Sequence, residues 1–352
     1  MSSAPVIFAA VPTLFGPGGE LDLDANRALY KFVAGWVDGL FVAGTTGEFP
    51  ALEDAERLSL LELALAEAGC DRVIAHIGAP DARHAGRLAQ AAVALGATRI
   101  AAITPYYLPA RSDELIAHYR AIRDAAPGAE LYAYIFPERT GLPVSATLFA
   151  RVAEAAGLAG AKISGSAAAE LAGYVAAAPG LRFFSGDDAN PAATMRAGGA
   201  GVISGRSSAY PEVYAALQQQ PREQGAQETL DQIVALGASV GRLKHALRLR
   251  GFGTGTARMT VDPPDLQTGA AIAALVAAAQ MYTGADVNPD RGWRVVLCRG
   301  PAQAGRRTSE KLGRRLTGPR RALRGRGQPA RGPRDRPGRS PHLPSGAAGS
   351  GH

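Results

Sequence analysis

The stretch "RVIAHIGAPDARHAGRLAQAAVALGATRIAAITPYY" (residues 72–107) decides how the rest of the chain is interpreted. Its ends, residues 72–80 and 98–107, are short apolar runs bounded by Gly, Pro or Asp. They lack polar alternation, which is typical of strands that are buried on both faces. Residues 81–96 between them carry apolar side chains at helical spacing. The stretch therefore predicts two parallel strands joined by a helix.

The same alternation extends in both directions from this stretch. Strand-like apolar runs occupy residues 6–15, 39–48, 72–80, 98–107, 131–138, 158–166, 181–188 and 200–207. Eight such units closing on themselves predict an α/β fold of the (β/α)₈ TIM-barrel type. An open, doubly wound sheet is the alternative. It expects a G-x-G-x-x-G loop after the first strand, where this chain has "LFGPGGELD" (14–22), so the barrel is favoured.

We predict three parts of the chain: the barrel (residues 1–225), a C-terminal helical extension packed on it (226–283) and a disordered tail (284–352). Residues 226–249 and 263–282 have helical spacing, whereas the tail is rich in Arg, Gly and Pro. The net charge of +7 is misleading, because residues 291–352 carry 16 Lys and Arg against two acids, and the remainder carries a net charge of −7. A nucleic-acid interaction would depend on the tail alone, and an unstructured extension is the favoured interpretation.

Composition limits the other possibilities. Two cysteines without a CxxC pattern favour a reducing, cytoplasmic location. The N-terminus lacks the pattern of a signal peptide, and no apolar run is long enough to cross a membrane. No three His, Cys, Asp or Glu residues have the spacing of metal ligands. We therefore expect a non-membrane enzyme that needs no metal or other cofactor.

Lys162 is the first candidate for chemistry, because it is one of only four lysines in a chain that uses arginine freely. In TIM barrels, catalytic groups lie at the carboxyl ends of the strands. Desolvation on a barrel strand disfavours a charged amine, and a neutral amine can form a Schiff base with a keto acid. Tyr134, Thr45 and Tyr107 could transfer protons. Backbone N–H groups of residues 44–48 could hold a carboxylate at a helix N-terminus.

Each of these residues also has a purely structural interpretation. Lys162 could form an ion pair, and Tyr134 could fill the core. Thr45 and Thr46 could cap the following helix. Arg139 could pair with Glu138.

The motifs "GTTGE" (44–48), "TPYY" (104–107), "YIFPERTG" (134–141), "GAKISG" (160–165), "SGDD" (185–188) and "GVIS" (201–204) resemble the dihydrodipicolinate synthase/N-acetylneuraminate lyase family. The resemblance spans residues 6 to about 282. It implies a barrel that forms an imine between pyruvate and Lys162, with Tyr134 as general acid/base. It further implies a relay through Thr45 to Tyr107, which reaches in from a neighbouring subunit of a homotetramer. Substrate contacts are implied for Thr46, Arg139, Ile203, Gly44 and Gly47.

The chain also departs from the synthase pattern. Ile135 stands where the synthases have Asn, Glu138 precedes the arginine, and Ile163 follows the lysine in place of Glu. These changes concern the second substrate rather than the imine. We expect a 4-hydroxy-tetrahydrodipicolinate synthase-like lyase that condenses pyruvate with aspartate semialdehyde. The alternatives are a 2-keto-3-deoxy sugar acid aldolase or dehydratase and, more remotely, a non-catalytic barrel with a nucleic-acid-binding tail.

Overall fold

The fold is described by a computed structural model that covers residues 4–220 and 223–284. The predicted tail lies outside the described residues except for its first residue. Within the described part, eight parallel strands close into a barrel in the order β1 to β8. The strands are β1 (Val6–Ala10), β2 (Gly39–Val42), β3 (Val73–His76), β4 (Arg99–Ile103), β5 (Glu130–Ile135), β6 (Gly160–Ile163), β7 (Arg182–Ser185) and β8 (Gly201–Ser204). The predicted TIM-barrel fold is confirmed, and each strand lies in the apolar run that predicted it, except that β5 begins one residue before its run.

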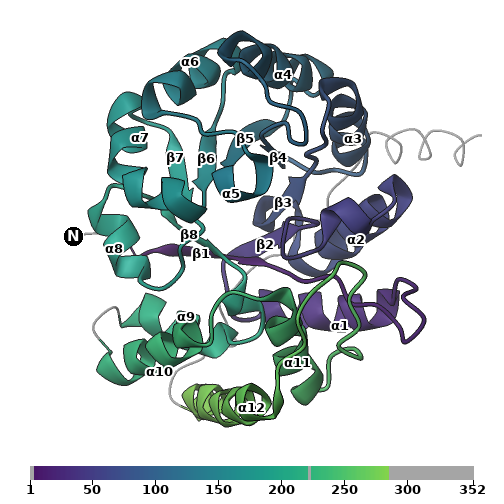
Figure 1. The fold of residues 1–352 in the computed structure, drawn as a ribbon, viewed down its shortest axis with the longest axis vertical. Coiled ribbons are helices and arrows are strands. Elements are labelled where there is room, and N and C mark those ends of the chain that lie inside the picture. Colours follow the sequence, from purple (N-terminus) through teal and green to yellow (C-terminus); the bar gives the residue numbers. More distant parts are fainter. Residues whose placement is uncertain (1–3, 221–222, 285–352) are drawn as a thin grey trace, which may run out of the picture. The chain divides into compact units, whose positions relative to one another are not determined.

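Helices surround the barrel (Figure 1). The α-helices are α1 (Leu23–Ala34), α2 (Asp54–Ala68), α3 (Ala82–Ala94), α4 (Ser112–Ala125), α5 (Pro137–Thr140), α6 (Ala146–Ala156), α7 (Leu171–Ala177), α8 (Pro191–Arg196), α9 (Pro211–Gln219), α10 (Gln224–Ala235), α11 (Val240–Leu249) and α12 (Leu266–Gln280). The 3₁₀ helices are η1 (Phe49–Ala51), η2 (Cys70–Arg72), η3 (Gly165–Glu170), η4 (Arg206–Ser208) and η5 (Met281–Gly284). None of the helices in the described part of the chain is both long and apolar enough to span a bilayer.

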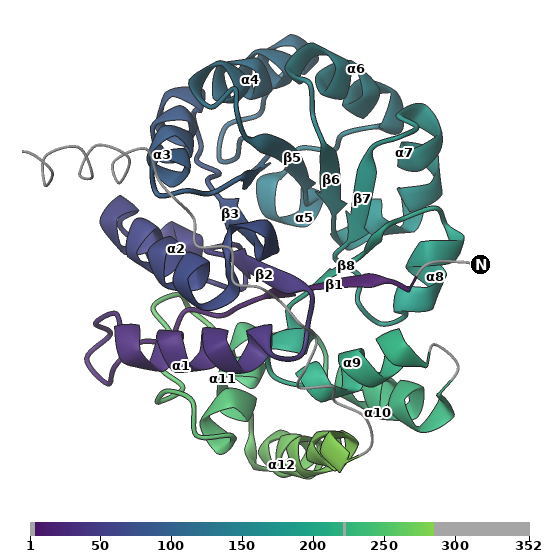
Figure 2. The same cartoon turned by 180° about the vertical axis from the view of Figure 1, so that it is seen from behind.

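The helices that follow the eighth strand differ from the prediction in one respect. The segment predicted as helical over residues 226–249 contains two helices, α10 and α11, because Gly237 adopts a φ of +79° and Ser239 caps the second helix through its side chain. Helices α9 to α12 gather on one side of the barrel, beside α1, in both views (Figures 1 and 2). The domain boundary at residue 225 remains a prediction.

The barrel interior is packed with side chains from its own strands and with Phe49 of η1. A separate cluster of buried residues fills it, comprising Phe8, Ala10, Phe41, Phe49, Ile74, Ala101, Ile103, Tyr132, Tyr134, Phe184 and Ile203. Register fixes the neighbours within this cluster. Tyr134 on β5 lies directly opposite Lys162 on β6, which in turn lies opposite Phe184 on β7. Because in-register residues of adjacent strands point to the same face, Tyr134 and Lys162 are neighbours inside the barrel.

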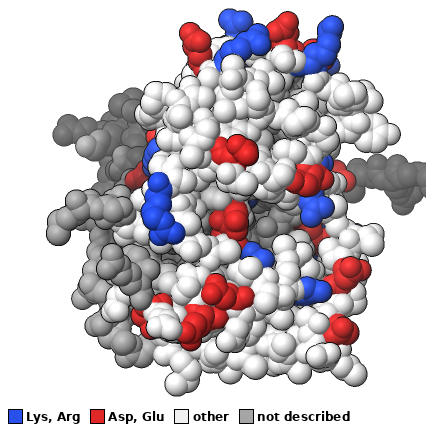
Figure 3. Space-filling model, turned by 60° about the vertical axis from the view of Figure 1, so that its left-hand side comes forward, with Lys and Arg blue, Asp and Glu red and all other residues white. Residues whose placement is uncertain are grey.

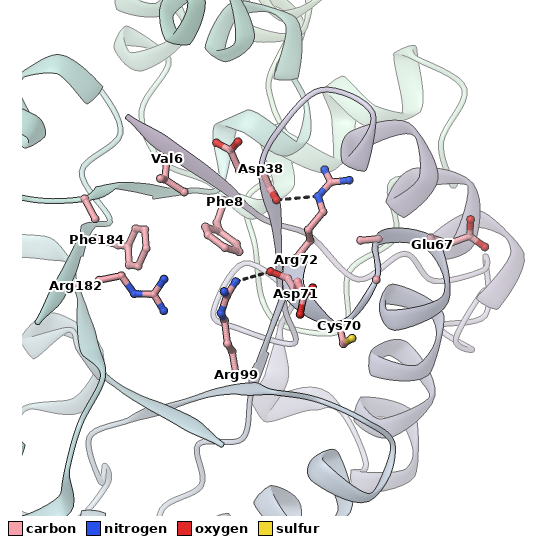
Figure 4. A pocket seen from close by; sticks show the side chains of 13 residues that line it. Val6, Phe8, Asp38, Glu67, Cys70, Asp71, Arg72, Arg99, Arg182 and Phe184 are labelled. Carbon is pink, nitrogen blue, oxygen red and sulfur yellow. Dashed lines mark hydrogen bonds between the residues drawn. The ribbon is translucent and has the colours of Figure 1, made fainter. Parts of the chain in front are cut away.

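The amino end of the barrel holds a cavity of about 320 Å³ (Figure 4). Phe8 and Phe184 lie edge to face there, with ring centroids 5.6 Å apart. Arg99 donates to the Asp71 carbonyl at 2.5 Å and pairs with Glu130 at 3.2 Å. Arg182 pairs with the same Glu130. These ion pairs join the starts of β4, β5 and β7. We therefore interpret this end of the barrel as stabilising the fold.

Candidate active site

A larger cavity, of about 790 Å³, lies at the carboxyl ends of the strands. This is the end of a TIM barrel where active sites occur. The short helix α5 at this end lies in front of the strands in Figure 1 and behind them in Figure 2. The predicted site residues that line the cavity are Thr45, Thr46, Tyr134, Arg139, Lys162 and Ile203. The structure therefore brings together most of the residues that the sequence indicated.

Lys162 is enclosed by aromatic rings. All four residues of β6 are buried, and Lys162 is 5% exposed. Its Nζ lies 4.4 Å from the ring centroid of Tyr134 and 4.6 Å from that of Phe41. Within residues 4–220 and 223–284, Lys162 has no ion pair with a carboxylate. The amine therefore faces the cavity without a counterion, so the ion-paired alternative does not hold in the described part of the chain.

Tyr134 and Thr45 are joined by a hydrogen bond of 3.2 Å between their hydroxyl oxygens, in which either oxygen can be the donor. Tyr134 is 1% exposed, and its ring packs edge-on against Phe41 with centroids 5.9 Å apart. The Tyr134 ring that carries this hydroxyl also lies against the Lys162 amine. Proton transfer between two hydroxyl groups needs this kind of contact.

The loop that carries Thr45 and Thr46 is tightly packed. A Cβ added at Gly44 would lie 2.5 Å from the Phe41 ring, and one at Gly47 would lie 3.1 Å from the Ala43 Cα. Neither glycine lines the cavity, so close packing accounts for both, and their contact with substrate remains a prediction. The helix that follows is the three-residue η1, whereas α2 begins only at Asp54. The expected carboxylate anchor at a helix N-terminus therefore falls on the short η1, and it remains a prediction.

Thr46 lies close to the end of β8. A Cβ added at Gly205 would come within 3.2 Å of the Thr46 Oγ1. Ile203, two residues before Gly205, lines the same cavity. This arrangement places the threonine hydroxyl and the end of β8 on one side of the cavity, where a small carboxylate can contact both.

Tyr107 differs from the other predicted catalytic residues. Its side chain is 92% exposed, it does not line the cavity, and its φ is +79°. Tyr106 lines the cavity instead and packs edge-on against Phe49, with centroids 5.9 Å apart. Tyr107 therefore lies outside the cavity that Thr45 and Tyr134 line, and its part in proton transfer remains a prediction.

Arg139 on α5 lines the cavity and is exposed. Its guanidinium carbon lies 5.5 Å from the Phe136 ring centroid. Glu138 does not pair with it in the described structure. The Glu138 carboxylate accepts a hydrogen bond from the Ser166 N–H at 2.7 Å, and hydrogen bonding by Ser166 lowers the pKa of Glu138. Arg139 is therefore available to an anion despite its acidic neighbour.

Sequence reasoning did not single out Ser164 as a site residue. Ser164 is 4% exposed and lines the cavity, and its Oγ has no hydrogen-bond partner in the described structure. A buried hydroxyl without a partner is unfavourable unless a ligand or water satisfies it. The position of Ser164, two residues after Lys162, was the available sequence signal.

Asp188 and Arg206 form an ion pair at the cavity wall. The Ser204 hydroxyl donates to Asp188 at 2.5 Å. Asp188 therefore takes part in an ion pair and in a hydrogen bond at the cavity wall. Among the described residues, no group of three or more His, Cys, Asp and Glu could hold a metal ion.

Comparison with known proteins agrees with this geometry. Residues 4–277 match the Dihydrodipicolinate synthetase family. An uncharacterized DapA-like lyase from Halobacterium salinarum is 34% identical over 260 residues, which is 70% of this chain and 85% of that protein. A 4-hydroxy-tetrahydrodipicolinate synthase from Mycolicibacterium gilvum is 33% identical over 292 residues, which is 78% of this chain and 94% of that protein.

A solved structure is similar as well. The prophage protein YagE of E. coli K12, a dihydrodipicolinic acid synthase family member in complex with pyruvate, superimposes with a TM-score of 0.71 at 27% identity. The match covers 78% of this chain and 98% of that chain.

Proposed function

This chain belongs to the dihydrodipicolinate synthetase family, a lyase family, and from that premise we propose that it joins pyruvate to an aldehyde, or separates the two, through an imine at Lys162. The observation that carries the proposal is the enclosed Lys162 amine, which has no ion pair in the described structure and touches the Tyr134 ring.

The proposed reaction begins with attack of the neutral Lys162 amine on the keto carbon of pyruvate. The carbinolamine takes up a proton and loses water, which leaves a protonated imine that withdraws electrons from the neighbouring methyl carbon. That carbon loses a proton and becomes the nucleophilic end of an enamine. The enamine forms a carbon–carbon bond with the aldehyde carbon, whose oxygen takes up a proton. Water then hydrolyses the new imine, which releases the product and restores the amine. Cleavage follows the same steps in reverse.

We assign the proton transfers to Tyr134, which shares a hydrogen bond with Thr45. Thr46, which lies beside Gly205, and Ile203 on β8, which lines the same cavity, would hold the pyruvate carboxylate. A covalent imine supplies the electron sink within the protein itself, so the proposed chemistry requires neither a metal nor another cofactor.

Aspartate semialdehyde is our first choice of aldehyde, as in a 4-hydroxy-tetrahydrodipicolinate synthase. Arg139 supports this choice, since it lines the cavity and has no ion pair in the described residues. A guanidinium binds a carboxylate by paired hydrogen bonds.

A second candidate is a 2-keto-3-deoxy sugar acid, cleaved or dehydrated at the same imine. Ser164 favours it, because a buried hydroxyl without a partner in the described structure suits a hydroxylated substrate chain.

The exposed Tyr107 supports an assembly of several copies in which this side chain completes the site of a neighbour. We propose a homotetramer on this basis, and a cytoplasmic location from the cysteine content. Analytical ultracentrifugation tests the assembly, and a monomer with full activity would exclude the role of Tyr107.

Turnover distinguishes the two substrates. We expect the purified full-length chain to consume pyruvate with aspartate semialdehyde faster than it cleaves any member of a panel of 2-keto-3-deoxy sugar acids. A reversed order would assign the chain to the second candidate. Failure of every substrate, together with failure to exchange the pyruvate methyl protons, would reject the lyase chemistry.

A further inference from the structure

Both ends of the loop that carries Thr45 and Thr46 have a left-handed backbone. Ala43 has a φ of +53° and Glu48 a φ of +56°. This conformation is unfavourable for a residue with a Cβ, and it persists only where surrounding contacts enforce it. The contacts at residues 43 and 48 therefore determine where the two threonines between them lie.

His76 holds the first end. Its Nδ1 lies 2.8 Å from the Ala43 carbonyl oxygen, and the Ile103 N–H donates to its Nε2 at 3.3 Å. Burial keeps the pKa of His76 well below its ordinary value, so the ring is neutral. Since Nε2 accepts, the hydrogen of the neutral ring is on Nδ1 and is donated to Ala43.

Glu48 holds the second end. It is 1% exposed, and its Oε2 accepts the N–H groups of Arg258 at 2.9 Å and Met259 at 2.8 Å. Its Oε1 forms an ion pair with Lys244 on α11, which is also 1% exposed. The Lys244 Nζ donates in addition to the Thr256 carbonyl at 2.8 Å. A buried carboxylate that loses its ion-pair partner is strongly destabilised.

We propose that Lys244 and Glu48 are positioning residues for the imine chemistry. Their buried ion pair joins the C-terminal helices to the left-handed end of the 43–48 loop. It thereby holds Thr45 against Tyr134 and Thr46 in the cavity. The inference rests on the proposed function, since it assigns the pair an effect on pyruvate binding.

The alternative is an ion pair that contributes to folding alone. The chain offers a matched control for it. Arg250, at the end of α11, forms a second buried ion pair with Glu212 on α9, and their side chains are 4% and 1% exposed. Within the described residues, neither Arg250 nor Glu212 forms a hydrogen bond or an ion pair with the 43–48 loop. Loss of either pair should destabilise the fold, but only loss of the Lys244 pair should alter the site.

The test uses the full-length chain with the substitutions Lys244→Met and Arg250→Met. Borohydride trapping over a range of pyruvate concentrations gives the concentration that half-saturates adduct formation. We expect Lys244→Met to raise it about tenfold or more, because small misplacement of binding groups has effects of this size. Amide hydrogen exchange in the peptide that covers residues 43–49 should become faster. Arg250→Met should match the wild type in both measurements.

A folded Lys244→Met protein with wild-type half-saturation and wild-type exchange would overturn the inference, as would an equal change in Arg250→Met. If Lys244→Met does not fold, the double variant Glu48→Gln/Lys244→Met removes the uncompensated charge, and the same results are expected from it. Rapid amide hydrogen exchange of residues 43–49 in the wild type would also overturn the inference, regardless of the results for the variants. Absence of any adduct in the wild type would reject the proposed function instead, while the exchange comparison would still test the positioning.

Discussion

Tyr134→Phe removes one oxygen from the centre of the site and leaves the aromatic ring in place. Because Tyr134 is 1% exposed and packs edge-on against Phe41, phenylalanine can keep the same packing. Within the described part of the chain, the hydrogen bond that is lost is the one with Thr45, of 3.2 Å. A neutral hydrogen bond of this kind contributes about 0.5–1.5 kcal/mol to the free energy of unfolding. The variant should therefore fold and lose at most about 1.5 kcal/mol of stability.

The effect on catalysis should be far larger. A positioned general acid or base accelerates a reaction by about 10²- to 10⁴-fold. We expect Tyr134→Phe to slow proton removal from the pyruvate methyl group by a factor in this range. The measurement is the loss of the methyl proton signal of pyruvate in D₂O, followed by NMR with catalytic amounts of protein. No aldehyde is required, so the result does not depend on which second substrate is correct.

Tyr132→Phe is the matched control. Tyr132 lies two residues earlier on the same strand, and its hydroxyl donates to Glu130 at 2.9 Å, at the opposite end of the barrel. Its removal should leave the exchange rate unchanged. Wild-type exchange by Tyr134→Phe, or equal slowing by both variants, would refute the assignment of Tyr134 as the general acid/base.

Three further predictions concern other parts of the chain. Arg139→Ala should lower kcat/KM for an anionic aldehyde about 10- to 100-fold, because the loss of one charge-assisted hydrogen bond has an effect of this size. The trapping of pyruvate by borohydride should be unchanged. An equal loss in both measurements would exclude Arg139 as the second-substrate contact. Burial lowers the pKa of His118 from 6.5 to about 4, so the unfolded state binds its proton more tightly and stability falls as the pH drops through 6.5. Urea unfolding should show that the wild type loses about 2 kcal/mol more than His118→Leu between pH 7 and pH 5, and identical pH dependence would contradict this. Gly165→Ala should lower the Tm more than Gly141→Ala: both residues have positive φ, but only at Gly165 would the new Cβ meet Glu138, at 1.9 Å. Equal losses would show that this contact relaxes without cost.

The sequence predicted the barrel because each strand is buried on both faces and is therefore a short apolar run. It also indicated Lys162 as the candidate reactive amine, since a lysine at the end of such a run has few ordinary explanations in a chain rich in arginine. The break between α10 and α11 was missed, because Gly237 and Ser239 lie within an otherwise continuous helical pattern.

The contacts that position the site residues could not be predicted from local sequence patterns. Glu48 and Lys244 meet only because the helices after β8 pack back beside the first strands, and their spacing in the sequence carries no signal. Tyr107 has a left-handed backbone and an exposed side chain, and no side-chain pattern indicates either feature. The hydrogen bond of Glu138 to Ser166 likewise depends on the turn at Gly165.

Borohydride reduction of the wild-type protein in the presence of pyruvate, followed by peptide mass spectrometry, tests the imine most directly. The chain has four lysines, so the modified position can be assigned without ambiguity. We predict a single reduced pyruvyl adduct, on Lys162, which is absent when pyruvate is omitted and absent from Lys162→Met. Unmodified Lys162, or an adduct that forms on Lys31, Lys244 or Lys311 instead, would contradict the proposed chemistry.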